Sequence, residues 1–343
     1  MRVGTLIVGQ GLAGSLLARR LAESGSVLVV DPAESNASQV AAGLMTPLTG
    51  RKFRLTPEYP RLFARALEVY RPLGVLSTIL VYRMFADAEQ RCAGVARALD
   101  PDCAPFVDQV TDAAGQLDAD LADSLGGVLM RGAWVDLPRL LEDSRAWLAG
   151  RLLRDRVVAR EMEDRADSVR WKGIQADRVV WCDGWRAMLP GGLWSDVPWQ
   201  PAKGEALDLV SDAPEKSFVL NREGWALPLG GGRWRTGTNW DWAVQDEIPT
   251  AAQREKLSAR FVSYFAAAPT VDITGHVAGV RPCTRDNRPC VGQHATRTRH
   301  FLLNGLGPRG TVWAPTAIDA LVGLMEGGTP VPAELAVGRL VAV

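Results

Sequence analysis

The sequence predicts an α/β fold in which a parallel sheet is combined with a second, mostly antiparallel sheet. Apolar strand and helix patterns alternate from Val3 to Asp31, which is typical of a parallel sheet. Between Lys203 and Asp241 the pattern changes to short strands separated by Gly, Pro and Asn turns, which is typical of antiparallel pairing. The chain has 343 residues, enough for about two domains at roughly 150 residues each.

The composition is that of a globular protein with a core. Lys and Arg together number 39, as do Asp and Glu, and 47% of the residues are hydrophobic. These values exclude disordered, collagen-like and low-complexity classes, and the neutral charge balance argues against a nucleic-acid partner. One local exception is the stretch from Arg51 to Arg71, where six basic residues accompany two acidic ones. Such a stretch is typical of a solvated helix face.

Cysteine usage and the N-terminal sequence bear on the compartment. The five cysteines contain no C-x-x-C pair, which fits neither a disulfide framework nor a zinc site. The three histidines lie at no metal-ligand spacing, so we predict no metal site. The run from Thr5 to Gly9 is too short for a signal peptide, and no stretch approaches the roughly 18 apolar residues of a membrane span. We therefore expect a cytoplasmic protein with no membrane association.

The N-terminal segment predicts a strand, helix and strand around a glycine motif. Val3–Val8 and Val27–Val30 are apolar strands, and Leu12–Leu21 has helical spacing. Gly9–Gly14 reads G-x-G-x-x-G between the first strand and the helix, and Asp31 closes the second strand. This arrangement predicts that the segment binds a dinucleotide.

Each glycine of this motif has a physical role in dinucleotide binding. Gly9 allows a tight turn, Gly11 leaves room for a pyrophosphate, and Gly14 lets helix and strand pack closely. The free N–H groups of the helix N-terminus face the phosphates, and Asp31 accepts hydrogen bonds from ribose hydroxyls. The spacing alone does not separate FAD from NAD.

Three later stretches also predict close approach to a ligand. Ala37–Pro47 is rich in small residues, which let a backbone approach a flat ring. Ala278–Gly292 contains an arginine-proline motif, and Phe301–Thr311 is a strand that enters a second glycine-rich loop. Ala314–Met325 is predicted as the following helix, whose N-terminus points toward that ligand.

Over nearly its whole length the chain resembles the family of D-amino-acid oxidase, glycine oxidase and sarcosine oxidase. The family's motifs occur in order: Gly9 to Gly14, Asp31, Ala37 to Gly43, Asp177 to Trp185, Lys203 to Glu205, Arg281, and the closing glycine loop. The resemblance implies FAD rather than NAD, bound in a Rossmann-like domain of the glutathione-reductase type. It also implies an interleaved substrate domain built on a mostly antiparallel sheet. Gly307–Gly310 and Thr284–Asp286 look closest to glycine oxidase and to the oxidase domain of a bifunctional tRNA-modifying enzyme.

The second domain is therefore expected to be inserted into the first. We predict an FAD-binding domain from residues 1–76, 128–198 and 276–343, and a substrate domain from residues 77–127 and 199–275. The elements expected in the second part of the substrate domain are strands at Glu205–Val210, Phe218–Asn221, Gly224–Pro228 and Trp234–Thr238, and a helix at Ala251–Ala266.

The motifs and the resemblance together predict the residues that contact FAD. They are Gly9, Gly11, Leu12, Ala13, Gly14, Asp31, Pro32, Ser38, Ala41, Ala42, Gly43, Leu44, Val158, Gly184, Gly307, Arg309, Gly310 and Thr311. Cys283 is in register with a position that does not attach flavin in the family, so we predict non-covalent FAD. Cys182 and Asp183 stand where the family commonly has small residues, which predicts an acidic group near the cofactor.

Two arginines are predicted to carry the catalytic contacts. Arg281 matches the family's carboxylate-binding arginine, and a guanidinium is the preferred partner for a carboxylate. Arg309 is expected to face the flavin carbonyl region or the substrate, with a structural salt bridge as the alternative. Lys203 either lies near the flavin or simply begins a strand. Four tryptophans are candidates for an apolar cage around the substrate or for core packing, namely Trp225, Trp234, Trp240 and Trp242.

The leading functional prediction is oxidation of the C–N bond of a small amino acid or secondary amine by hydride transfer to flavin N5, followed by hydrolysis of the imine. Dioxygen is the acceptor if the protein is an oxidase, and another acceptor if it is a dehydrogenase. A second hypothesis is a tRNA-modification oxidase that acts on a carboxymethylaminomethyl-type nucleoside and binds phosphates through Arg51–Arg71. A third is a flavoprotein without turnover. Substrate identity and oligomeric state stay open.

Overall fold

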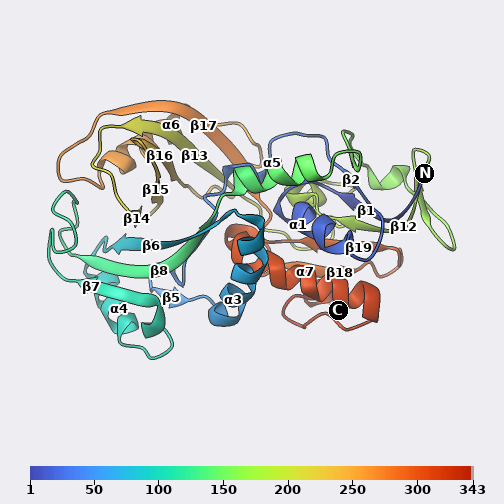
Figure 1. The fold of residues 1–343 in the computed structure, drawn as a ribbon, viewed down its shortest axis with the longest axis horizontal. Helices are drawn as coiled ribbons and strands as arrows, with labels where there is room; N and C mark the ends of the chain where they lie inside the picture. The colour runs from blue at the N-terminus through green and yellow to red at the C-terminus, as the bar shows by residue number, and fades with distance from the viewer. Residues whose placement is uncertain (341–343) are drawn as a thin grey trace.

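The computed structural model describes residues 1–340, which form two large β-sheets that lie side by side and a separate two-stranded sheet. Figure 1 shows the sheet that contains β1, β2, β12 and β19 on one side of the molecule and the sheet that contains β6, β8 and β13 to β16 on the other. In the described residues, no helix combines the length and the apolar character needed to cross a membrane.

The first sheet is built on parallel strands. Its parallel order is β9, β2, β1, β12, β19. Their bounds are β1 (Arg2–Val8), β2 (Val27–Val30), β9 (Leu152–Leu153), β12 (Ile174–Trp181) and β19 (His300–Asn304). Three antiparallel strands extend it: β10 (Glu163–Asp164), β11 (Val169–Trp171) and β18 (Cys290–Gln293). The predicted N-terminal strand, helix and strand are present, so the parallel-sheet prediction is confirmed.

Both faces of this sheet are buried, as expected for parallel strands. One face packs against helices α1 (Leu12–Leu21), α3 (Tyr59–Tyr70), α5 (Leu137–Trp147) and α7 (Gly310–Gly327). The other face packs against a second apolar cluster that includes Trp171, Trp181 and Trp194. The glycine loops therefore lie at the edge of a rigid double-sided core.

The second sheet is antiparallel except at one pair of strands. Its order is β17, β13, β16, β15, β14, β6, β8, β3, with β7 paired to β8, and only β14 and β6 run parallel. The bounds are β3 (Leu44–Met45), β6 (Leu76–Met84), β7 (Val107–Thr111), β8 (Gly127–Val135), β13 (Ala202–Ser211), β14 (Phe218–Asn221), β15 (Trp225–Gly230), β16 (Arg233–Gly237) and β17 (Val271–Arg281). Helix α6 (Ala251–Val262) packs on it through Phe261, whose ring lies 5.3 Å from that of Trp234.

Shorter elements connect the two sheets. They are α2 (Ala37–Val40) and the hairpin of β4 (Leu48–Thr49) and β5 (Arg54–Leu55). Helix α4 (Ala88–Ala98) instead links β6 to β7 within the second sheet and packs against β7 and β8. Short 3-10 turns are formed by Arg71–Leu73, Ala104–Phe106, Ala159–Glu161, Gly184–Met188, Gly307–Arg309 and Val337–Arg339.

Two predicted helices have different ends in the structure. Helix α6 stops at Val262 rather than Ala266, because Phe265 bridges to Leu121 and the N–H of Ala266 donates to Asp120 O at 2.8 Å. Helix α7 begins at Gly310 rather than Ala314, because the 3-10 turn Gly307–Arg309 leads directly into it. Gly310 and Thr311 are therefore in the first turn of the helix and not in a loop.

Sheet membership also differs from the predicted domain segments. β8 pairs with β6, from the pair of Leu76 with Val135 to the pair of Met84 with Gly127. Residues 128–135, which the sequence placed in the FAD-binding segment 128–198, therefore belong to the antiparallel sheet. β17 crosses the predicted boundary at residue 276 as one continuous strand paired with β13. The sequence pattern missed both because strand pairing between distant segments leaves no local signal.

The two tryptophans Trp234 and Trp242 provide a test of this packing. Trp234→Ala should lower the free energy of unfolding by about 3–5 kcal/mol, because its side chain is 1% exposed between sheet and helix. Trp242→Ala, at a side chain that is 61% exposed, should lower it by less than about 1 kcal/mol. Urea unfolding at matched FAD saturation measures both, and equal losses would contradict the packing described here.

Candidate active site

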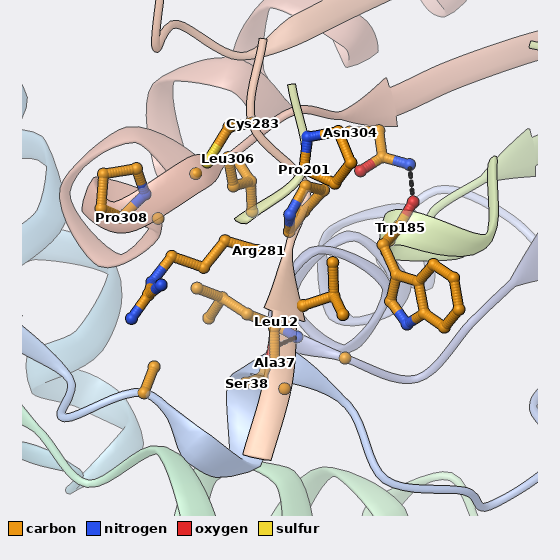
Figure 2. Close-up of a pocket in the computed structure, with 18 of the residues that line it drawn as sticks. Leu12, Ala37, Ser38, Trp185, Pro201, Arg281, Cys283, Asn304, Leu306 and Pro308 are labelled. Carbon is orange, nitrogen blue, oxygen red and sulfur yellow. Dashed lines mark hydrogen bonds between the residues drawn. The ribbon is translucent and has the colours of Figure 1, made fainter. Parts of the chain in front are cut away.

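A large cavity lies where the two sheets meet. Its volume is about 1790 Å³, above the roughly 300–1,000 Å³ typical of a site for one small ligand. Its walls come from the glycine loops of the first sheet and from one face of the second. Figure 2 shows Leu12, Ala37 and Ser38 on one side of this cavity and Arg281, Leu306 and Pro308 on another. The space is sufficient for a dinucleotide and a substrate together.

The turn after β1 has the geometry predicted for its glycines. Gly9 has a φ of 103°, and a Cβ on Gly14 would lie 1.9 Å from Gly9 O, so neither position accepts a side chain. A Cβ on Gly11 would meet only Ser38 Oγ, at 3.2 Å. Ser38 Oγ also accepts a hydrogen bond from the N–H of Leu12 at 3.0 Å. Helix α1 thus presents its N-terminus to the cavity, and Ser38 is the side chain that contacts it there.

Asp31 is held at the cavity wall by two backbone donors. One carboxylate oxygen accepts from the N–H of Gln10 and the other from the N–H of Ala33, both at 2.7 Å. A carboxylate oxygen can accept further bonds, so Asp31 remains able to bind ribose hydroxyls. Pro32 and Val158 line the cavity beside it.

The middle of the cavity is formed by the segment after α2. Gly43 has a φ of 77°, and a Cβ there would lie 2.0 Å from Val135 O. The Thr311 hydroxyl donates to Leu44 O at 3.2 Å, which ties the first turn of α7 to this segment. Ala41 and Ala42 also line the cavity, so small side chains leave the backbone accessible to a flat ring.

Asp183 places an acidic group beside the Gly9 turn. It lines the cavity, and a Cβ on Gly9 would lie 3.2 Å from the Cα of Asp183. Burial raises the pKa of its carboxyl to about 7. Asn304, which Figure 2 shows near Trp185, donates to Gly184 O at 2.8 Å and holds this segment in place.

Arg281 ends β17 with its guanidinium in the cavity. Its Nη2 donates to Thr238 Oγ1 at 2.7 Å, and its Nη1 lies 3.3 Å from Asn239 O. Burial lowers its pKa to about 10. The guanidinium carbon lies 4.5 Å from the ring centre of Trp240, and a Cβ on Gly204 would lie 2.1 Å from Nη2. The absent side chain of Gly204 is therefore what leaves room for the guanidinium.

Arg309 begins the turn into α7 and is less firmly held. Its guanidinium lies 3.4 Å from Thr56 Oγ1 and 3.4 Å from Asn287 O, and burial lowers its pKa. Within residues 1–340 neither Arg281 nor Arg309 has a carboxylate within 4.0 Å. The predicted alternative of a structural salt bridge at Arg309 is therefore absent from the described part of the chain.

The structure brings nearly all of the predicted site residues to one cavity. Every predicted cofactor residue except Gly14 lines it, and Gly14 is buried at the contact between α1 and the Gly9 turn. Lys203 does not line it, because its ammonium donates to Asp246 Oδ1 and Ile248 O, both at 2.6 Å, and stabilises a loop. Of the four tryptophans, Trp234 is in the core and the other three line the cavity.

Several lining residues were not predicted from the sequence. Arg83 and Asn221 reach the cavity from β6 and β14, and Thr238 follows β16. No pattern in the sequence distinguishes Arg83 from the other arginines, because its position follows from the pairing of β6 with β14 and β8.

The fold and the cavity together define an oxidoreductase that binds a flavin dinucleotide. The family model described as FAD dependent oxidoreductase matches residues 5–322, and the chain belongs to this family. It is an FAD-dependent amine or amino-acid oxidoreductase, which confirms the predicted family, cofactor and enzyme class.

Individual relatives agree with this assignment. The chain is 28% identical to glycine oxidase of Pseudomonas putida, over 95% of each chain. It is also 28% identical to the tRNA 5-methylaminomethyl-2-thiouridine biosynthesis bifunctional protein of Azoarcus sp., covering 96% of this chain but only 58% of that relative. The structure of glycine oxidase from Geobacillus kaustophilus superposes with a TM-score of 0.78 over 95% of each chain at 20% identity, which shows a shared fold.

The pKa of Asp183 predicts a pH-dependent affinity for FAD. Below pH 7 the carboxyl is neutral, and above pH 7 its charge repels the FAD phosphates, so the dissociation constant should rise between pH 6 and 8. The rise is limited to about tenfold per pH unit for one proton. Fluorescence titration of the apoprotein with FAD measures it. Asp183→Asn should flatten the profile, whereas Glu34→Gln, at a cavity acid already paired with Arg186 at 3.1 Å, should not. Equal profiles in all three proteins would refute the effect.

Non-covalent attachment of FAD is a further expectation. Burial raises the pKa of the Cys283 thiol to about 11, so the nucleophilic thiolate is scarce at neutral pH. Acid precipitation of the purified protein should release all of the yellow chromophore into the supernatant. Colour retained in the washed pellet would contradict this expectation.

Proposed function

We propose that this enzyme oxidises a small amino acid or secondary amine whose carboxylate is bound by Arg281. The observation that carries the proposal is a partly buried guanidinium with no carboxylate partner in the described residues, facing the cavity where FAD fits. Burying an unpaired charge is costly, so the site favours an anionic ligand. The relative described as glycine oxidase supports the proposal, because glycine is a small amino acid.

The residues around Arg281 orient the substrate. Thr238 and Asn239 hold the guanidinium by neutral acceptors, which leaves its charge available to a carboxylate. Trp240 stacks against it and shields one side from water. A substrate whose carboxylate is bound by Arg281 therefore has its amine-bearing carbon in the region between Arg281 and the glycine loop at Gly307.

FAD supplies the redox chemistry when bound, because it accepts a hydride from the carbon that carries the amine. The substrate nitrogen loses a proton to water, and a C=N bond forms. Water then adds to this bond and releases a carbonyl product and ammonia or an amine. Arg309, with no ion pair in the described residues, supplies a positive charge at the end of the cavity that the flavin ring would occupy.

Arg281→Gln tests the carboxylate contact. For glycine, sarcosine and D-amino acids, kcat/KM should fall on the order of a hundredfold, because a charge-assisted contact is lost. FAD content should stay unchanged, and amines that lack a carboxylate should lose less. Anaerobic flavin bleaching across this panel gives the rates. An unchanged kcat/KM for the amino acids would remove Arg281 from the site.

The electron acceptor separates an oxidase from a dehydrogenase. Dioxygen accepts two electrons and two protons to form hydrogen peroxide, so an oxidase produces peroxide stoichiometrically with the carbonyl product. Substrate-reduced flavin that persists in air would instead indicate a dehydrogenase with another acceptor.

The second candidate is oxidation of a carboxymethylaminomethyl-type nucleoside in tRNA, and the Azoarcus relative favours it. The basic stretch proposed to bind phosphates is partly neutralised, because Arg51 pairs with Asp87 at 2.6 Å and Arg65 with Asp319 at 2.7 Å. A gel-shift titration with bulk tRNA at low salt tests it, and absence of binding would exclude it. A cytoplasmic location remains part of the proposal.

A further inference from the structure

Arg83 is a second partly buried cation that the proposed reaction does not use. Its Nη1 lies 3.3 Å from Leu48 O and its Nη2 donates to Gly50 O at 2.7 Å. Its guanidinium carbon lies 3.9 Å from the ring centre of Phe53, and burial lowers its pKa to about 10. In residues 1–340 no carboxylate lies within 4.0 Å of it, although it lines the cavity. It therefore resembles Arg281 in being partly buried, held by neutral acceptors and without an ion pair in the described residues.

A row of paired residues connects the two arginines across the second sheet. Arg83 on β6 is the register partner of Asn221 on β14, Asn221 of Trp225 on β15, and Trp225 of Gly237 on β16. Register partners on neighbouring strands point to the same face of a sheet, here the face that lines the cavity. A Cβ on Gly237 would lie 2.7 Å from Trp225 Cζ2, so the indole covers this glycine.

The row ends where Arg281 is anchored. Thr238 follows Gly237 directly, and its hydroxyl accepts the hydrogen bond from Arg281 Nη2. The cavity floor therefore presents a cation, an amide, an aromatic surface and a second cation in that order. From β6 to β16 there are three inter-strand steps of about 4.8 Å, or roughly 14 Å along the sheet.

Among residues 1–340, no carboxylate in this part of the cavity forms an ion pair with Arg83. The phosphates of FAD fit at the N-terminus of α1, which belongs to the other sheet. Glu223, in the turn between β14 and β15, also lines the cavity but forms no ion pair with Arg83. Arg51 already has Asp87 as its partner.

We propose that Arg83 binds a second anionic group of the substrate, at the opposite end from the carboxylate bound by Arg281. The substrate class is then a secondary amine with a carboxylate on each side of the nitrogen, an N-carboxyalkyl amino acid, whose alkyl chain lies over Trp225. This inference rests on the proposed function for the identity of the reacting bond, and it adds the second charge and the spacing between the charges.

Binding of an unreactive diacid tests the inference without turnover. 5-(Carboxymethylthio)pentanoic acid carries sulfur in place of the amine nitrogen, so it cannot form a C=N bond. Its comparison ligand is 5-(carboxymethylthio)pentanamide, which has the same length and lacks the distal negative charge. Isothermal titration of the FAD-loaded enzyme should show the diacid binding about tenfold or more tightly than the amide. Equal affinities would overturn the proposal.

Variants assign the preference to Arg83. Arg83→Gln should remove most of the preference in affinity for the diacid over the amide. Arg83→Lys should retain part of this preference because the positive charge remains. Arg222→Gln is the matched control, since Arg222 follows Asn221, stacks on Tyr264 at 5.7 Å and does not line the cavity. Its preference should equal that of the unaltered enzyme. A preference that survives in Arg83→Gln, or that falls instead in Arg309→Gln, would overturn the assignment.

The outcomes separate this inference from the proposed function. If the diacid is preferred through Arg83 but no amine or amino acid bleaches the flavin, the second anion site stands and the proposed oxidation fails. If glycine or sarcosine bleaches the flavin and the diacid has no preference, the oxidation stands and the second anion site fails.

Discussion

The pairing of β17 with β13 is the contact on which the site depends. β17 carries the chain from the antiparallel sheet toward the glycine loops. It pairs with β13 from the pair of Val271 with Ser211 to the pair of Arg281 with Ala202. Figure 1 shows β17 as the long strand that runs along the antiparallel sheet toward the centre of the molecule. The register shifts once, between Asp208 and Leu209, and is regular from the pair of Asp208 with Gly275 to the pair of Ala202 with Arg281, so Arg281 lies at the point where the two sheets meet. A one-residue slip would turn its side chain to the other face.

Glycine positions determine which backbones can approach one another around the cavity. Gly14 allows α1 to contact the Gly9 turn, Gly43 allows its segment to approach β8, and Gly204 leaves space for the Arg281 guanidinium. In each case a Cβ would lie within 2.1 Å of another atom. The cavity therefore has its shape because side chains are absent at a few crossing points, while the apolar clusters behind them keep the walls rigid.

Charge is arranged locally in a chain that has no net charge. Exposed arginines such as Arg65 are neutralised by surface carboxylates, whereas Arg281 and Arg309 face the cavity with only neutral acceptors in the described residues. At the other end, Asp183 lies beside the turn where FAD phosphates fit, and burial raises its pKa. The cavity wall therefore carries both cations without ion pairs and an acidic group whose charge depends on pH.

The sequence by itself determined the features that depend on local pattern. The strand, glycine turn and helix at Val3–Leu21, and the strand at Phe218–Asn221, follow from residue periodicity and turn chemistry, and the structure contains them. Only the tertiary structure decided the parallel pairing of β14 with β6 and the place of β8 in the second sheet. The tertiary structure also made Arg83 the register partner of Asn221, which in turn pairs with Trp225. These depend on contacts between residues far apart in the chain, and such contacts leave no signature in a single local stretch of sequence.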